Sequence, residues 1–179
     1  MKIGTMANYY FVSKVESHKK LKGYLLKTWS EIGFVSVKSN SEQIINTDYE
    51  IANQPRLWTD LFMRKIQPNL LEIQHSLLAD DFFFDKIWFQ QYIKSDYHGW
   101  HVHANTNYSA IYFTECPSGM ETEFFDITTK KKFEIQLEEG DLIVFPGQIY
   151  HRSKPNFTDQ RKSVVSFNLS FINNNEQKV

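Results

Sequence analysis

Beyond residue 80 the chain is a series of short segments typical of β-strands, with no helical segment between them. Aromatic and β-branched residues are frequent in these segments, and the hydrophobic period is close to two residues. Turn-forming sequences such as CPSG, EEGD and KPNFTD separate them. Seven or eight strands at this spacing predict an all-β sandwich or barrel. The segments are FFFDKIWFQQYI, GWHVHA, YSAIYFTE, TEFFDI, KFEIQL, GDLIVFPG, YHRSK and RKSVVSFNLSFI.

The first 80 residues have a different pattern, which predicts helices. Leucine, isoleucine and tryptophan recur at helical spacing in residues 14–33, and residues 55–81 show the same pattern. Gly33 suits a helix end, whereas Pro68 should kink or split the second helix. The polar residues 39–54 between the two helices predict a loop with short turns.

The two parts together predict a single α+β domain, mainly β, over residues 1–179. The helical part covers about residues 1–80, and the β-barrel, where we expect the chemistry, covers about residues 81–173. The helices should pack on the outside of the barrel. A length of 179 residues and an aromatic content of 16% are sufficient for a packed core and argue against disorder.

The charge and cysteine content narrow the class of function. With 20 basic and 21 acidic residues the net charge is −1, so the basic surplus typical of nucleic-acid-binding proteins is missing. The sequence contains neither a signal-peptide pattern nor the run of about 18 apolar residues that a membrane span needs. Cys116 is the only cysteine, which favours a reducing compartment, and we therefore expect a cytoplasmic protein.

The segment YHGWHVHANTNYS contains three of the six histidines. His101 and His103 are two residues apart, so on a strand both side chains point to the same face. His151 follows the strand GDLIVF and can supply a third imidazole if the two strands are neighbours in a barrel. A pair in the pattern H-x-H is a weak signal alone, but with His151 it predicts a three-histidine metal site. His98 is out of phase and should lie beside this site or at the surface.

Arg161 and Ser163 share strand parity, and their side chains together suit a carboxylate. An arginine that points into a barrel needs either an internal acid or an anionic ligand, because a buried lone charge is costly. The alternative is an outward-facing Arg161, like its neighbour Lys162. Apolar residues at 165, 167 and 169 share the parity of Arg161 and favour the inward orientation, although Val164 has the opposite parity.

The motifs H-x-H, GDLIVFPGQIYHRS and RKSVVSFN, in this order and spacing, resemble the iron(II)- and 2-oxoglutarate-dependent oxygenases. They are particularly similar to a small branch from marine bacteria and phages with the signature WHxH…EGD…FP…HRS…N…RxSxSFN. The resemblance covers about residues 88–171. It implies a double-stranded β-helix, that is, a jelly-roll, cupin-like barrel with flanking helices. It further implies a dioxygenase that uses Fe(II), 2-oxoglutarate and O2, and that hydroxylates a substrate with release of succinate and CO2.

By this resemblance the metal ligands are His101 and His151, and His103 stands where the family usually has an aspartate or glutamate. We expect His103 to be the third ligand. The alternative is a carboxylate such as Asp96 or Glu115, with His103 in support. Three imidazoles also suit zinc or nickel, which bind nitrogen more tightly than iron does and can occupy the site in purified protein.

The resemblance also implies the cosubstrate contacts. Arg161 would bind the far carboxylate of 2-oxoglutarate and count among the catalytic residues with the three histidines. Ser163 would add a hydrogen bond to the same carboxylate. Tyr112, Tyr92 and Asn168 are polar residues on predicted barrel strands that can contact the cosubstrate as well.

Two other functions fit parts of the pattern. A cupin-like metal protein or dioxygenase would have a three-histidine site without 2-oxoglutarate, but cupins normally have a glutamate a few residues after H-x-H, and here ANTN follows. A non-catalytic barrel would hold a structural metal in a closed coordination sphere. The substrate is a small molecule or a peptide: peptidyl proline, free amino acids, nucleobases and other metabolites all fit, and the sequence does not define an oligomeric state.

Overall fold

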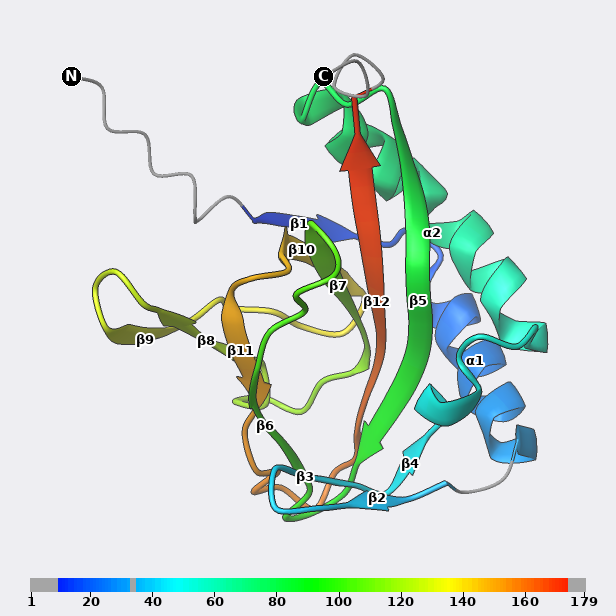
Figure 1. Ribbon diagram of the computed structural model, residues 1–179. Coiled ribbons are helices and arrows are strands. Elements are labelled where there is room, and N and C mark those ends of the chain that lie inside the picture. Colours follow the sequence, from blue (N-terminus) through cyan, green and yellow to red (C-terminus); the bar gives the residue numbers. More distant parts are fainter. Residues whose placement is uncertain (1–9, 33–34, 174–179) are drawn as a thin grey trace.

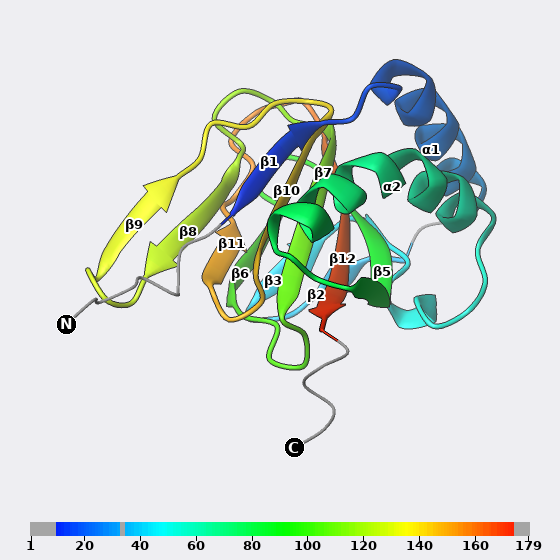
Figure 2. The same cartoon turned by 90° about the horizontal axis from the view of Figure 1, so that it is seen from above.

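The computed structural model describes residues 10–32 and 35–173 of the chain (Figure 1). Two six-stranded sheets, each with antiparallel neighbours, face each other, and two helices cover the outer face of the first sheet (Figures 1 and 2). The sheets are separate hydrogen-bonded units and do not close into one continuous barrel. The predicted α+β class, mainly β, with the helices outside, is confirmed.

The first sheet has the order β1-β10-β7-β12-β5-β4, and the second has the order β2-β3-β6-β11-β8-β9. The strands of the first are β1 (Phe11–Lys14), β10 (Asp141–Pro146), β7 (Tyr108–Glu115), β12 (Lys162–Ile172), β5 (Asp81–Tyr92) and β4 (Asn46–Thr47). Those of the second are β2 (Val37–Lys38), β3 (Glu42–Ile44), β6 (Tyr97–His101), β11 (Tyr150–Ser153), β8 (Thr122–Asp126) and β9 (Lys131–Glu134). The helices are α1 (His18–Ile32), α2 (Leu57–Ser76) and the 3-10 turn η1 (Tyr49–Ile51).

The helices are held to the first sheet by an aromatic core. Trp29 of α1 stacks on Phe89 of β5 with ring centroids 4.5 Å apart, and Phe62 of α2 meets Phe167 of β12 edge to face. Each of these side chains is fully buried, and burial of one such side chain contributes roughly 1.5–3 kcal/mol. The outer face of the first sheet therefore carries the larger apolar core, and a smaller one that includes Phe113, Phe124 and Phe145 lies between the sheets.

Two local expectations are wrong. Residues 39–54 form β3, β4 and η1 rather than a loop, because their polar side chains are partnered: Asp48 accepts hydrogen bonds from Arg56 Nη1 at 2.7 Å and Trp58 Nε1 at 3.0 Å. Of the two outcomes expected at Pro68, the split is wrong, since α2 runs through this residue without interruption. Isoleucine, leucine and aromatic residues along one side of α2 are buried on the sheet, which offsets the hydrogen bond that proline cannot make.

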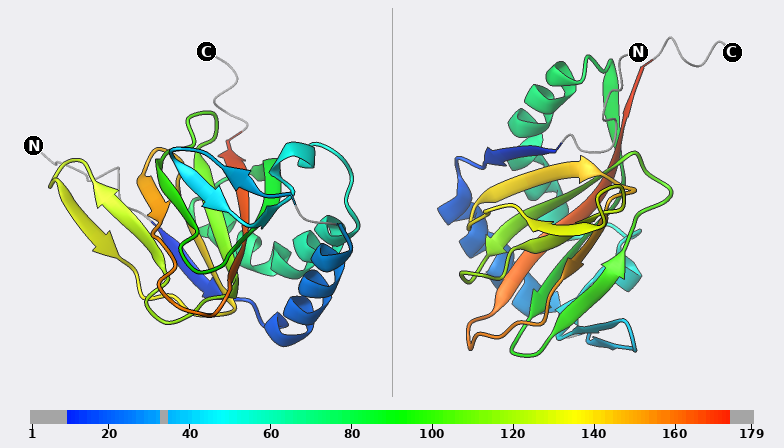
Figure 3. Two further views of the ribbon diagram at one scale, coloured as in Figure 1. Left: turned by 90° about the horizontal axis from the view of Figure 1, so that it is seen from below. Right: turned by 90° about the vertical axis from the view of Figure 1, so that its left-hand side faces the viewer.

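The β8–β9 hairpin and the helices each have one further feature of note. The β8–β9 hairpin projects away from the side that carries the helices (Figures 2 and 3). In the described part of the chain, neither helix has the length and apolar character that crossing a bilayer requires. The division into one domain stays a prediction.

Candidate metal centre and cosubstrate pocket

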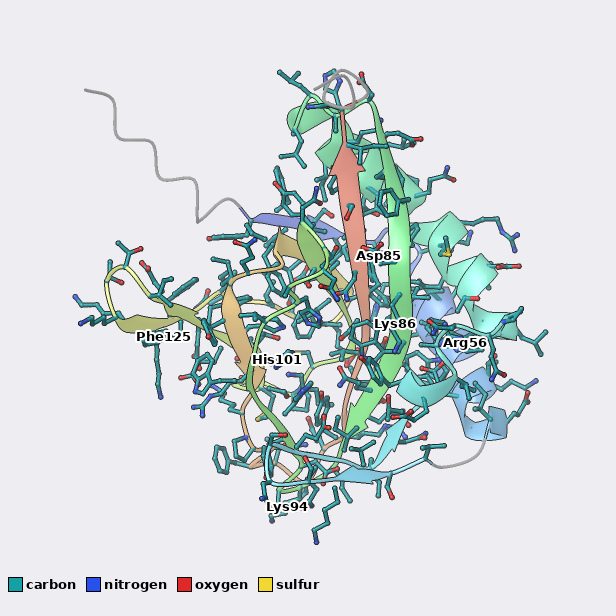
Figure 4. The ribbon with its side chains drawn as sticks, in the orientation of Figure 1. Arg56, Asp85, Lys86, Lys94, His101 and Phe125 are labelled. Atoms are coloured by element: carbon teal, nitrogen blue, oxygen red, sulfur yellow. The ribbon has the colours of Figure 1, made fainter. Side chains whose placement is uncertain are left out.

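Three imidazoles converge between the two sheets. His101 lies on β6 (Figure 4). It pairs directly with His151 of β11, and His103 follows two residues after it. Their ligand atoms all lie within 4.8 Å of one another. The predicted convergence is therefore confirmed, although His103 stands just beyond the end of β6 and not on the strand itself.

A backbone contact fixes His103 outside the strand. Its N–H donates to the carbonyl of Gly147 at 2.7 Å, in the turn before β11. A Cβ atom at Gly147 would lie 2.8 Å from the His103 carbonyl oxygen, closer than real Cβ contacts. The glycine thus lets the turn approach closely enough to hold His103 beside the other two histidines.

The protonation of two of the rings follows from their backbone partners. His101 Nδ1 lies 2.8 Å from the carbonyl oxygen of Gly99, and His151 Nδ1 lies 2.9 Å from that of Ile149. A carbonyl oxygen only accepts, so each Nδ1 carries the hydrogen and each Nε2 keeps its lone pair. This arrangement is typical of histidines that bind a metal through Nε2.

Burial keeps these imidazoles neutral. It lowers the pKa of His101 and places that of His151 well below its usual value. Burial, aided by the charge of His101, lowers the pKa of His103 to about 4. Neutral imidazole is the form that binds metal ions, so the chemistry of this donor set fits a divalent cation.

The alternative carboxylate ligands lie elsewhere. Asp96 accepts hydrogen bonds from Gln43 Nε2 at 2.9 Å and from the Ile93 N–H at 3.0 Å. Glu115 is bound by Arg161 and Ser163. Among the described residues, only the three histidines form a group that could hold a metal ion. The geometry thus favours His103 as the third ligand.

The prediction that Arg161 points into the barrel is wrong. Arg161 precedes β12, its side chain is 42% exposed, and it binds Glu115 through Nε at 2.8 Å and Nη2 at 3.1 Å. Ser163 is buried, but its hydroxyl donates to Glu115 and accepts from Gln91 Nε2 at 3.1 Å. Neither side chain lines the cavity that contains the histidines.

Lys162 occupies the place expected for Arg161. Its side chain is 1% exposed and lines the same cavity as the three histidines. Nζ donates to Ser153 Oγ at 3.0 Å and lies 5.7 Å from the ring centroids of Tyr92 and Phe113. No carboxylate within the described residues forms an ion pair with it. Burial lowers the pKa of Lys162 to about 8, as expected for an ammonium group without a counter-ion.

Two signals in the sequence could have identified Lys162. It shares strand parity with Val164, Ser166 and Asn168, all of which line the cavity. The signature RxSxSFN, aligned on the residues Ser166 to Asn168, also places its basic residue four positions before Ser166, at Lys162.

Of the three other residues predicted to contact the cosubstrate, two line the cavity and one does not. Asn168 and Tyr92 line the cavity, and Asn168 Oδ1 accepts from Ser109 Oγ at 3.1 Å. The prediction for Tyr112 is wrong, because this side chain faces the helices. Its hydroxyl lies 2.7 Å from His18 Nδ1, and its ring packs against Phe62.

His98 supports the metal centre from the side. Its ring stacks on that of His101, with centroids 3.9 Å apart and an interplanar angle of 11°. His98 Nδ1 lies 3.4 Å from Gln90 Nε2, and His98 Nε2 lies 3.4 Å from Glu42 Oε2. Burial lowers the pKa of His98 to about 3, so this ring is neutral as well.

A comparison with known families agrees with this site. Residues 86–168 match the sequence profile of the 2OG-Fe(II) oxygenase family, and this range contains all three histidines and Lys162. These matched residues, just under half of the chain, have the sequence profile of the 2-oxoglutarate- and iron(II)-dependent oxygenases. The predicted cofactors, Fe(II), 2-oxoglutarate and O2, are those of this family. A comparison with curated protein sequences gives no match.

Solved structures confirm the fold of the oxygenase. A viral collagen prolyl hydroxylase from Paramecium bursaria Chlorella virus-1 has 15% identity and a TM-score of 0.64, covering 90% of this chain and 96% of that one. A prolyl-4-hydroxylase from Pseudomonas putida has 14% identity and a TM-score of 0.61, covering 92% of each chain. An oxidoreductase of the 2OG-Fe(II) oxygenase family from Burkholderia pseudomallei has 10% identity and a TM-score of 0.71, covering 92% of this chain and 88% of that one. These similarities establish the double-stranded β-helix, and membership of the marine and phage branch stays a prediction.

Proposed function

We propose that this oxygenase is a hydroxylase that converts a C–H bond of an organic substrate into C–OH. One oxygen atom of O2 enters the substrate and the other enters succinate, so R–H, O2 and 2-oxoglutarate give R–OH, succinate and CO2. Bound iron(II) would supply the activation of O2 that organic side chains cannot provide. The protein supplies the ligands, the orientation of the cosubstrate and the exclusion of water.

The observation that carries this proposal is the buried ammonium group of Lys162 in the cavity of the three histidines, which has no carboxylate partner among the described residues. A buried cation without a counter-ion is costly, and an anionic ligand removes that cost. 2-Oxoglutarate has two carboxylates, so one can bind at the metal centre while Lys162 and Ser153 hold the other. Three neutral ligands leave the metal its full double charge, which also favours an anionic cosubstrate.

The other residues of the cavity have passive roles in this proposal. The carbonyl groups of Gly99 and Ile149 hold the rings of His101 and His151 in one orientation. Val164 and Phe145 line the cavity and help to exclude water, which strengthens the contact between Lys162 and a carboxylate.

The experiment that tests the proposal uses purified protein with Fe(II) and 2-oxoglutarate under anaerobic conditions. We expect a weak visible charge-transfer band that needs both components, and release of succinate when O2 is admitted. A cupin-like protein that does not use 2-oxoglutarate would bind iron but show neither signal. Iron binding without the band would therefore contradict the proposal.

The pKa of Lys162 predicts how cosubstrate binding depends on pH. Because the pKa is lowered to about 8, the ammonium form dominates below that pH and the neutral amine dominates above it. The ratio kcat/KM for 2-oxoglutarate, which reports the free enzyme, should fall by about tenfold per pH unit above pH 8. A profile from about pH 6.5 to about pH 9.5 checks this, and Lys162→Arg should remove the break because guanidinium stays charged. A flat profile for the wild-type protein would contradict the role of Lys162.

A further inference from the structure

A second pocket adjoins the metal centre, and Lys162 does not line it. His101, His103 and Trp88 line both cavities, so the metal site lies at their boundary. The other wall carries residues of β2, β3, β4 and η1. Of these elements, β3 pairs with β6, the strand that carries His101 (Figure 1). A molecule in this second pocket would reach the metal centre without passing Lys162.

The charge of the second pocket is opposite to that of the first. Glu42 and Glu50 are the charged residues of its wall, and no lysine or arginine of the described chain lines it. Within residues 10–32 and 35–173, neither carboxylate forms an ion pair with lysine or arginine, and the only ion-pair neighbour of Glu42 there is His98, which burial keeps neutral. Burial and the charge of Glu50 raise the pKa of Glu42, so the two carboxylates are close enough to repel each other.

A lysine that contacts one residue of this pocket is already engaged there. Lys86 of β5 places Nζ 3.4 Å from the ring centroid of Tyr49 and does not line the pocket (Figure 4). That contact already shows the face of Tyr49 partnered by an ammonium group. Two carboxylates beside an aromatic wall therefore remain without a positive partner of their own.

Trp88 provides a second, independent indication of a ligand. Its side chain is 4% exposed, and within the described residues its indole N–H donates to no protein group. This nitrogen is not among the fully enclosed atoms without a partner, which are Trp29 Nε1 and Thr114 Oγ1, so it can be reached from the cavities that Trp88 lines. A donor that no protein group occupies and that a cavity reaches can bond an oxygen acceptor of a bound molecule. The rings of Trp88 and Tyr49 meet edge to face at 5.2 Å and form one aromatic wall.

We infer that the substrate is a basic amino-acid residue, free or within a peptide, whose ammonium or guanidinium group binds between Glu42 and Glu50. Carboxylates and aromatic rings together are the groups that recognise such a cation. The indole of Trp88 would donate to an oxygen of the same molecule. The two carboxylates would also repel 2-oxoglutarate from this pocket and direct it to Lys162. This inference rests on the proposed hydroxylation, in which the substrate C–H bond becomes C–OH with release of succinate and CO2.

The test compares matched probes with the iron-loaded enzyme and 2-oxoglutarate in air. The cationic probes are L-arginine, L-lysine, Gly-Arg-Gly and Gly-Lys-Gly, and the neutral and anionic controls are L-citrulline, L-norleucine and L-glutamate. At least one cationic probe should raise succinate release above the substrate-free rate by about tenfold and gain one oxygen atom by mass spectrometry. L-Citrulline has the shape of L-arginine without its charge and should have no such effect. The peptide probes distinguish a peptide substrate from a free amino acid.

Variants then assign the effect to the pocket. Glu50→Gln and Glu42→Gln should each raise KM for the active cationic probe by about tenfold, the effect of losing one charge-assisted hydrogen bond. Glu72→Gln removes an exposed carboxylate from α2 and should leave that KM unchanged. Glu50 is exposed and forms no ion pair with another described residue, so its replacement tests the charge without disturbing the fold.

Three results would overturn the inference. The first is equal stimulation by L-citrulline and L-arginine. The second is a cationic probe whose KM is the same in both pocket variants as in the wild-type protein. The third is no stimulation by any cationic probe although the anaerobic band and the slow substrate-free release of succinate are present. Absence of both the band and succinate would instead reject the proposed hydroxylase, and the substrate assignment with it.

Discussion

Replacing Lys162 by methionine should weaken 2-oxoglutarate binding by about 100-fold or more and, at the same time, stabilise the ligand-free protein. The loss of affinity follows because the far carboxylate would be buried without a cation, and truncating one partner of such a pair costs roughly 2–5 kcal/mol. The gain in stability follows because the ammonium group has no counter-ion in the ligand-free state. Its pKa of about 8 against the usual 10.5 corresponds to about 3 kcal/mol of destabilisation below pH 8.

Two measurements on Lys162→Met check this prediction. Titration of the anaerobic charge-transfer band gives the affinity for 2-oxoglutarate, and denaturant unfolding at neutral pH gives the stability. Arg161→Met is the matched control, since it removes a neighbouring positive charge that is exposed and paired with Glu115. It should leave the affinity within about twofold, because exposed pairs contribute little. A larger loss of affinity in Arg161→Met than in Lys162→Met would reinstate the original assignment.

The error at Arg161 has a physical cause in β12. This strand is buried on both faces, so hydrophobic alternation does not identify the face that points between the sheets. Val165, Phe167 and Leu169 belong to the core beneath the helices, and they carry the parity of Arg161. The sequence interpretation took the more apolar face for the barrel interior, whereas the cavity side is the more polar one.

Tyr112 was misplaced for the same reason, since it belongs to the helix-covered core with Phe62. The placement of the histidines did not depend on choosing between the two faces of a strand by their hydrophobicity. Their placement depended on spacing within H-x-H and on the pairing of β6 with β11, both of which follow from local pattern and strand order. The β-strands after residue 80 were predictable because turn sequences mark their ends. Residues 39–54 were not, because buried polar side chains such as Asp48 and Asn46 resemble a loop in composition.

Replacing His151 by alanine should abolish metal-dependent activity, with a loss of about 1,000-fold or more. His151 is 4% exposed and is one of the three neutral imidazoles in the group. Outer-sphere changes alone typically cost 10–100-fold in metal affinity, and loss of a ligand itself costs more. The variant also removes a ring whose centroid lies 4.8 Å from that of Phe145. The cavity left by this ring should destabilise the fold by about 2–4 kcal/mol.

Metal-induced stabilisation separates these two effects of His151→Ala. The wild-type protein should gain about 2.7 kcal/mol when Fe(II), Ni(II) or Zn(II) is present at about 100 times its Kd. The alanine variant should gain almost nothing at the same concentration, whatever its metal-free stability. His75→Ala, which replaces an exposed histidine on α2, should keep the full gain. A normal metal-dependent gain in His151→Ala would show that the metal is held elsewhere, and it would leave the neutral state of the three buried rings without a functional reason.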